Sequence, residues 1–237
     1  MPTGLVAILV LTAAELETRA LARALSLPPL TSLPFLAFGG GTLRIAPIGI
    51  GAGRLKERWP ALVAPSDCPL VISAGLCGAL DPGLRVGDLV VCESVIDGGG
   101  ARLSVTASAS QRAAAAGKAN PSTGAMVSSS RVVATPAAKA VLRAKTGGVA
   151  VDMESAAILE AAAMHGCASM IVRGISDDAR ETLPEELMVL MDADGRIRTS
   201  GVLALARPRV LAAALRLKRA SRHALGNVAG SLARLAA

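Results

Sequence analysis

Aromatic side chains are scarce in this chain of 237 residues, which has two Phe, one Trp and no Tyr. Proteins that bind single-stranded nucleic acid stack its bases on aromatic rings, so this composition argues against such binding even though the net charge is +7. The positive charge is also local, because residues 207–234 hold seven Arg or Lys and no Asp or Glu. We therefore expect no nucleic-acid partner.

Histidine and closely spaced cysteine pairs are scarce as well. The chain has only His165 and His223, and its four cysteines show no Cys-x-x-Cys spacing. A histidine-based triad or a zinc site therefore has few candidate residues, and scattered cysteines are typical of reduced, buried thiols in the cytoplasm. We expect no metal and no cofactor.

Long hydrophobic runs are missing too, although 52% of the residues are hydrophobic. Gly, Pro or charged residues interrupt every apolar stretch before it reaches the roughly 20 residues that span a bilayer. The first residues, Met-Pro-Thr-Gly, lack the basic start of a secretory signal. We expect a cytoplasmic protein without a membrane-spanning helix, folded as one domain over residues 1–237, a length that a single core can serve.

Short apolar runs alternate with helix-forming segments along the chain. Strands are predicted at residues 5–11, 42–48, 70–73, 88–95, 149–152 and 169–175. Helices are predicted at residues 13–25, 135–145, 154–165 and within 208–235. Several strand segments are apolar throughout, which predicts a three-layer α/β fold with a central, mostly parallel, twisted sheet. Residues 97–130, rich in Gly, Ala, Ser and Thr, are expected to be loop-rich.

Two glycine-rich segments, Gly39–Gly41 and Gly49–Gly53, invite comparison with nucleotide-binding loops. The second does not complete Gly-x-Gly-x-x-Gly because Arg54 occupies the last place, and the chain has no Gly-Lys-Ser/Thr loop. These glycines are equally typical of tight turns near a ligand. A dinucleotide-dependent oxidoreductase is therefore disfavoured.

Three segments point to a specific chemistry: Gly-Leu-Cys-Gly-Ala-Leu-Asp-Pro at 75–82, Val-Asp-Met-Glu-Ser at 151–155 and Arg-Gly-Ile-Ser-Asp at 173–177. Each is next to an apolar, strand-like run, and open parallel sheets gather ligand groups at the carboxyl ends of their strands. Together they resemble the purine and uridine phosphorylase superfamily, which includes the methylthioadenosine/S-adenosylhomocysteine nucleosidases. The resemblance implies a three-layer αβα fold and cleavage of a nucleoside's N-glycosidic bond.

The later run Leu183–Arg196 is similar to the hopanoid-associated phosphorylases within that superfamily. The predicted reaction is accordingly phosphorolysis of a purine nucleoside or of a 5′-modified adenosine such as adenosylhopane, with phosphate as co-substrate. One alternative is a hydrolytic nucleosidase of the methylthioadenosine/S-adenosylhomocysteine type. Another is a catalytically silent protein that binds a nucleoside or a membrane surface. Phosphate dependence of base release separates the first two.

Cleaving a purine riboside requires a protonated leaving base, a ribose that becomes oxocarbenium-like and a nucleophile, and carboxylates can serve all three needs. The resemblance implies that Asp177 protonates the base while Arg173 lies behind the base site and orients Asp177; a structural ion pair is the alternative for Arg173. It also implies that Glu17 activates water, with Glu15 as the competing residue. A helix N-cap is the structural alternative for Asp177.

The ribose site implied by the resemblance consists of Met153 and Glu154, with Asp152 where relatives often carry Glu. For Glu154 the structural alternative is a favourable charge in the first turn of a helix. Further substrate-lining residues are implied at Gly75, Leu76, Cys77, Gly78, Val132 and Ser176.

The chain departs from the family at the phosphate site. Hexameric purine phosphorylases place an Arg near Ser73 and a Ser near Leu76, and neither is present. Gly51, Arg54 and Ser73 are the candidate phosphate-binding residues that remain. A base-stacking Phe of several relatives is replaced near Val132, which predicts an apolar, non-aromatic wall.

The last segment, residues 208–235, carries apolar residues at helical spacing beside a basic face. It predicts an amphipathic helix that packs on the sheet. Its basic face also suggests peripheral contact with the anionic inner face of a membrane. The resemblance further implies a homo-oligomer.

Overall fold

The computed structural model describes residues 7–117, 121–184 and 207–237. Its strands are β1 (Ile8–Thr12), β2 (Phe38–Gly40), β3 (Leu43–Pro47), β4 (Leu70–Ala79), β5 (Leu89–Cys92), β6 (Ser94–Ile96), β7 (Arg102–Ser104), β8 (Ala125–Ser128), β9 (Ala150–Asp152) and β10 (Ser169–Asp177). Its helices are α1 (Glu15–Ala24), α2 (Leu55–Leu62), α3 (Ala109–Ala116), α4 (Pro136–Thr146), α5 (Ser155–Met164) and α7 (Pro208–Ala236), with a 3-10 turn at Ile50–Ala52.

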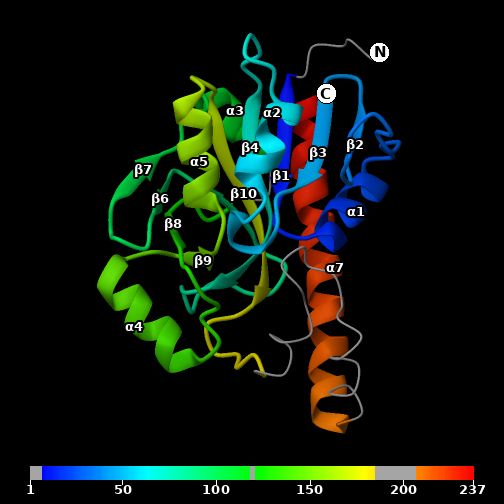
Figure 1. The fold of residues 1–237 in the computed structure, drawn as a ribbon. Coiled ribbons are helices and arrows are strands. Elements are labelled where there is room, and N and C mark those ends of the chain that lie inside the picture. The colour runs from blue at the N-terminus through cyan, green and yellow to red at the C-terminus, as the bar shows by residue number, and fades with distance from the viewer. Residues whose placement is uncertain (1–6, 118–120, 185–206) are drawn as a thin grey trace.

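The molecule has three layers, with helices on both faces of one sheet (Figure 1). Successive side chains of a strand point to opposite faces, and β1 is buried along its whole length. Ile8 and Val10 pack in one core with residues of α1 and α7, while Leu9 and Leu11 pack in another with residues of α2 and α5. The predicted three-layer α/β architecture is confirmed.

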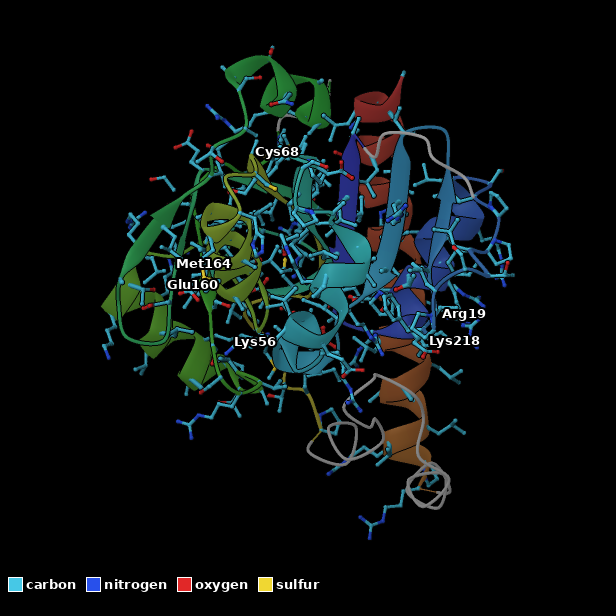
Figure 2. All side chains as sticks on the ribbon, turned by 45° about the horizontal axis from the view of Figure 1, so that its top comes forward. Arg19, Lys56, Cys68, Glu160, Met164 and Lys218 are labelled. Carbon is cyan, nitrogen blue, oxygen red and sulfur yellow. The ribbon has the colours of Figure 1, made fainter. Side chains whose placement is uncertain are left out.

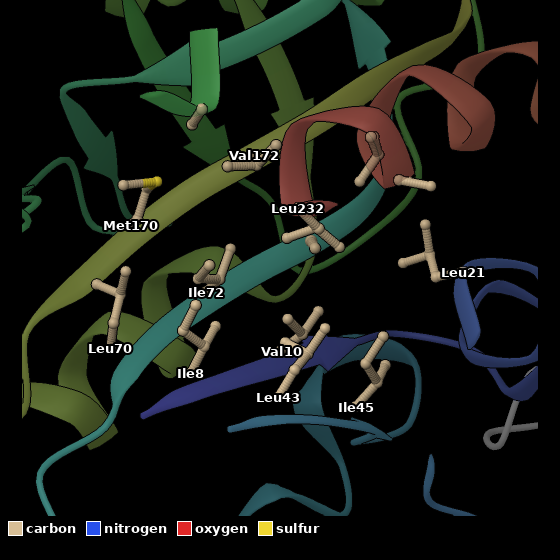
Figure 3. Close-up of a cluster of buried hydrophobic side chains, with 14 of the residues drawn as sticks. Ile8, Val10, Leu21, Leu43, Ile45, Leu70, Ile72, Met170, Val172 and Leu232 are labelled. Carbon is tan, nitrogen blue, oxygen red and sulfur yellow. The ribbon is translucent and has the colours of Figure 1, made fainter. Parts of the chain in front are cut away.

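The core beneath α7 crosses the centre of the sheet. Val10, Ile72 and Val172 come from the adjacent strands β1, β4 and β10, and Leu21 of α1 and Leu232 of α7 cover them (Figure 3). All five are fully or almost fully buried.

Long charged side chains cover the outer surfaces of the helices, as Arg19 of α1 and Lys218 of α7 show (Figure 2). In Figure 1 the second half of α7 packs behind the sheet, and the first half continues past the ends of the strands. Among the described residues, no helix is long and apolar enough to cross a membrane.

Strand β4 organises the sheet because three other strands pair with it. β10 runs parallel to it along one edge, from Val71 to Gly78. β1 pairs in parallel with Leu70–Ser73, and β9 pairs antiparallel with Gly78 and Ala79. Because β10 occupies one edge throughout, β1 and β9 share the other.

The carboxyl ends of β1 and β9 therefore point toward each other along β4. Between them, Ala74–Cys77 pair with neither strand. The centre of the sheet is parallel as predicted, but the antiparallel direction of β9 differs from a uniform parallel arrangement. That direction places the residues after β9 opposite those after β1.

The structure adds short elements to the loop-rich segment and lengthens one predicted strand. Residues 97–130 hold the short elements β7, α3 and β8, and about half of the described residues of this segment lie outside helices and strands, which agrees with the loop-rich prediction. Helix α3 begins where the Ser108 hydroxyl accepts a hydrogen bond from the Gln111 N–H, while the Gln111 side chain accepts from the Ser108 N–H, a capping box within an Ala-rich segment. Strand β4 extends six residues beyond the predicted Leu70–Ser73, so the Gly-Leu-Cys-Gly motif is part of the strand.

The run Leu183–Arg196, similar to the hopanoid-associated phosphorylases, lies outside the described residues from residue 185 onward. The predicted strand at residues 5–11 is described from Ala7. Strand β1 confirms the predicted strand from Ile8 onward, and the resemblance of Leu183–Arg196 stays a prediction.

Candidate active site

Glu17 lies in the first turn of α1, directly after β1. Its carboxylate accepts hydrogen bonds from the backbone N–H groups of Ala13 and Ala14, and Oε1 accepts one from the N–H of Leu76 at 2.9 Å. Burial raises the pKa of Glu17, and the nearby Arg173 charge and these N–H groups oppose the rise. Glu15, which is also buried, instead pairs with the exposed Arg19. The fold thus turns Glu17, and not Glu15, toward the gap along β4.

Two glycines of β4 make room for carboxylates. A Cβ atom on Gly75, whose φ is +137°, would lie 2.7 Å from Glu17 Oε1. A Cβ on Gly78 would lie 3.0 Å from Asp177 Oδ2. Three strand residues span roughly 10 Å, so the Glu17 and Asp177 carboxylates approach β4 at separated points. This explains the glycines of the Gly-Leu-Cys-Gly motif.

Arg173 of β10 is fully buried and joins several groups of the site. Its Nη2 lies 2.9 Å from Asp152 Oδ2 and 3.5 Å from Glu154 Oε2. The same guanidinium donates to Ser73 Oγ at 2.8 Å and to the carbonyl oxygen of Leu76 at 3.1 Å. None of these bonds goes to Asp177, so the prediction that Arg173 orients Asp177 is wrong.

Glu154 follows β9 and reaches across to the turn after β3. Its Oε1 accepts the N–H of Gly51 at 2.9 Å. Burial raises the pKa of Glu154 to about 7; the Arg173 charge opposes this rise, Asp152 adds to it, and the Gly51 N–H opposes it. Glu154 therefore does not cap the helix that follows it. The Asp152 carboxylate does so instead, because it accepts a hydrogen bond from the Ser155 N–H at the start of α5.

Met153, between these two acids, points its methyl group toward the same turn. The methyl carbon would lie 4.0 Å from a Cβ on Gly51. Met153 is half-buried, whereas the Asp152 side chain has no exposed surface. Asp152 also shares a short hydrogen bond with the Ser155 hydroxyl. The structure thus gives Asp152 a supporting position behind Glu154 and leaves it no surface for a substrate.

Asp177 ends β10, and both of its carboxylate oxygens have partners. Lys139 Nζ lies 2.6 Å from Oδ2, and the Ser176 hydroxyl lies 2.7 Å from Oδ1. No helix begins among the described residues after Asp177, up to residue 184, so it is not a helix N-cap. Lys139 was missed by sequence reasoning. The signal for it is a lysine on the inward side of the predicted helix at 135–145.

The three candidate phosphate-binding residues have other partners. Ser73 is fully buried, with its hydroxyl bonded to Arg173 and Ser155. The Gly51 N–H is taken by Glu154. Arg54 pairs with Glu57 on the surface, where their side chains are 46% and 66% exposed. The described residues therefore form no phosphate site from this set.

The remaining predicted lining residues separate into two groups. Leu76 is half-buried, and Val132 is 44% exposed, so both have surface to offer a ligand. Cys77 is buried in a hydrophobic core with its Sγ toward the carbonyl oxygen of Gly174, and burial raises its pKa well above the ordinary value. Its thiol therefore faces away from solvent and is held in the neutral form.

Charge in this cluster is mainly acidic. The carboxyl groups are Glu17, Asp152, Glu154 and Asp177, and the cations are Lys139 and Arg173. Both cations are already paired with carboxylates. Neither cation of this cluster is therefore free to bind a phosphate.

Residues 8–204 match the sequence model of the phosphorylase superfamily. The chain belongs to this superfamily. The matched residues cover most of the chain and include β1, β4, β9 and β10, the strands that carry the site. No curated protein matches the chain.

Solved structures of this superfamily share the fold at low sequence identity. The 5′-methylthioadenosine/S-adenosylhomocysteine nucleosidase of Helicobacter pylori with butyl-thio-DADMe-Immucillin-A matches with a TM-score of 0.70 and 17% identity, covering 97% of both chains. The corresponding Neisseria meningitidis enzyme with methylthio-immucillin-A gives 0.69 and 22%, covering 98% of this chain and 99% of its own. Futalosine hydrolase of Helicobacter pylori gives 0.70 and 16%, covering 97% and 96%.

Proposed function

We propose that this phosphorylase-superfamily member hydrolyses the N-glycosidic bond of a purine nucleoside, with water as the nucleophile. The observation that carries the proposal is that both cations of the site, Lys139 and Arg173, are already paired with carboxyl groups, and that the candidate phosphate-binding residues have other partners. This surrounding stabilises an oxocarbenium-like ribose and disfavours a phosphate dianion. It supports the hydrolytic alternative over phosphorolysis.

Each carboxyl group has a position suited to one part of the reaction. Glu17, held by three backbone N–H groups, takes the proton of the attacking water. Glu154 accepts hydrogen bonds from ribose hydroxyls while Met153 packs against the sugar. Asp177 gives a proton to the departing purine. Arg173 and Asp152 hold Glu154 in place from behind.

The substrate that we propose is an adenosine with a hydrophobic 5′ substituent. Leu76 and Val132 offer aliphatic surface without an aromatic ring, which suits an alkylthio or larger apolar group. Two of the structurally similar proteins are named for 5′-methylthioadenosine and S-adenosylhomocysteine. Adenosylhopane belongs to the same chemical class, and inosine and unmodified adenosine are the weaker substrates in this proposal.

The test is base release from a panel of nucleosides with and without phosphate. Hydrolysis predicts free ribose sugar as the product and a rate that is indifferent to phosphate. Ribose 1-phosphate, formed only when phosphate is present, would overturn the proposal in favour of phosphorolysis. Glu17→Gln should slow the reaction by about 10²-fold or more, because it removes the general base. Glu15→Gln, the matched change of the competing carboxyl group, which is buried and pairs with Arg19, should leave the rate within about twofold.

A homo-oligomer and peripheral membrane contact through α7 stay predictions. The basic side chains of α7 give the predicted membrane contact a physical basis, since they lie on a helix that extends past the strand ends (Figure 1). One of them, Arg216, pairs with Glu181 at 2.6 Å, four residues after Asp177. A surface that α7 meets would therefore lie near the base side of the site.

A further inference from the structure

Helix α4 is a surface helix whose single buried residue is a lysine. Of its 11 residues, all described, only Lys139 is buried, and its side chain has no exposed surface. Val141 on the same helix is 68% exposed. A lysine is the least favourable residue to bury, because its charge must be removed from water. The position therefore calls for a specific partner.

Every proton of the Lys139 ammonium group has an acceptor. Nζ donates to Asp177 Oδ2 at 2.6 Å, to the carbonyl oxygen of Asp178 at 2.6 Å and to that of Glu181 at 3.4 Å. An ammonium group has three donors, so none is left for a ligand. Lys139 can act on a substrate only through Asp177 and the backbone that follows it.

Asp177 is held by the same contacts. With Oδ2 on Lys139 and Oδ1 on the Ser176 hydroxyl, rotation of the carboxyl group would break a bond that is 2.6 or 2.7 Å long. The Asp177 side chain is 6% exposed, so little water is present to replace those bonds. A carboxyl group held in one orientation in this way can pass a proton to a base that binds in line with it.

We propose that Lys139 is the positioning residue for the acid that protonates the leaving base, an inference that rests on the proposed function. In the reaction Asp177 takes a proton from solvent as the nucleoside binds; its new O–H bond then breaks and an N–H bond forms on the purine. The electron pair of the C1′–N bond goes to the base. Asp177 becomes a carboxylate, and Lys139, which keeps all its protons, balances the new charge at once.

Leaving-group dependence separates this role from a merely structural one. A purine departs from ribose only with the help of a proton, whereas 4-nitrophenolate leaves without one. Lys139→Met should therefore lower kcat/KM for the best purine nucleoside by about tenfold or more and leave 4-nitrophenyl riboside within about twofold. The matched control is Arg143→Met, which removes an ion pair with Asp81 one turn further along α4. It should leave both substrates within about twofold.

A second comparison covers the case in which Lys139→Met does not fold because Asp177 is left as an unpaired buried charge. The double variant Lys139→Met/Asp177→Asn removes both charges and is compared with Asp177→Asn alone. If Lys139 acts through Asp177, the two should cleave the purine nucleoside at rates within about twofold. Equal losses on both riboside substrates, or a further tenfold loss in the Asp177→Asn background, would overturn the role of Lys139. Failure of the wild-type protein to cleave any riboside would instead overturn the proposed function.

Discussion

Single carboxyl groups in this site are buried beside one another, and burial changes how they hold protons. Glu154 is the clearest case, because its pKa is raised to about 7, mainly by loss of water around it. The pKa of Glu17 is raised for the same first reason. A group that holds its proton more tightly when folded links stability to pH.

We predict that the wild-type protein loses stability relative to Glu154→Gln as the pH rises from 5 to 8. Below the ordinary pKa of 4.5 both folded and unfolded forms are protonated, so the contribution of Glu154 is fully present. It is lost as the pH passes through about 7, where the buried group ionises. The difference amounts to up to about 3 kcal/mol, measured by urea unfolding at the two pH values. Glu160→Gln, an exposed position on α5 (Figure 2), should show no such change.

Asp177→Asn should reduce turnover far more than binding. An amide cannot give the base a proton, so kcat should fall by about 10²-fold to 10⁴-fold. The Kd of a non-cleavable nucleoside analogue should change by less than about tenfold, since the side-chain shape is kept. The neighbouring Asp178→Asn serves as control and should leave kcat within about twofold. Equal losses in kcat and binding would assign Asp177 to binding alone.

Strand β10 and helix α7 pack with almost no space between their backbones at one point. Where β10 crosses α7, a Cβ atom on Gly174 would lie 2.8 Å from the carbonyl oxygen of Ala224. β10 also carries Arg173 and Asp177, one residue before and three after this crossing. The contact between helix and strand therefore sets the position of the site residues.

We predict that Gly174→Ala lowers the free energy of unfolding by about 1–3 kcal/mol, because the added methyl group forces α7 away from β10. Gly226→Ala on α7 is the matched control, since nothing lies within 4 Å of its Cβ position. This change should raise the free energy of unfolding by up to about 1 kcal/mol through helix propensity. Urea unfolding measures both, and a Gly174→Ala protein as stable as the wild type would contradict the close packing.

The whole molecule presents α7 as its most basic surface. The helix is 29 residues long and has no acidic residue. Five of its six Arg and Lys side chains lie on the half that extends past the strand ends, and its apolar residues Leu225, Val228 and Leu232 are buried against the sheet. The second half of α7 therefore packs on the sheet, and the basic face of the first half is left available for contact with an anionic membrane.

We predict that the protein binds vesicles with anionic headgroups at low salt and is released as salt rises. Arg219→Gln/Arg222→Gln should weaken this binding, since each basic residue near the surface contributes about 1 kcal/mol. Lys56→Gln/Lys145→Gln, which removes the same charge from exposed positions elsewhere, should bind as the wild type does. Co-sedimentation measures all three. Absence of binding, or equal binding by both variants, would remove the membrane role.

The sequence by itself determined the class of fold and most of the groups that matter. Apolar runs between turn residues located β1, β3, β4, β9 and β10, because a strand covered on both faces needs continuous apolar side chains. The motifs at 151–155 and 173–177 carried the family and pointed to Glu154 and Asp177. These are local signals, and local chemistry is sufficient for them.

Tertiary structure decided which side chains touch. It turns Glu17 rather than Glu15 toward the site, and it pairs Arg173 with Glu154 and Asp152. It also pairs Asp177 with Lys139, which is 38 residues away in the sequence. It also reversed β9, so that Glu154 meets Gly51 across 103 residues of chain. Such contacts depend on the directions in which strands pair and helices pack, and a periodic pattern along the chain contains neither. For the buried charges the decision was energetic, because each one is stable only beside the partner that the fold brings to it.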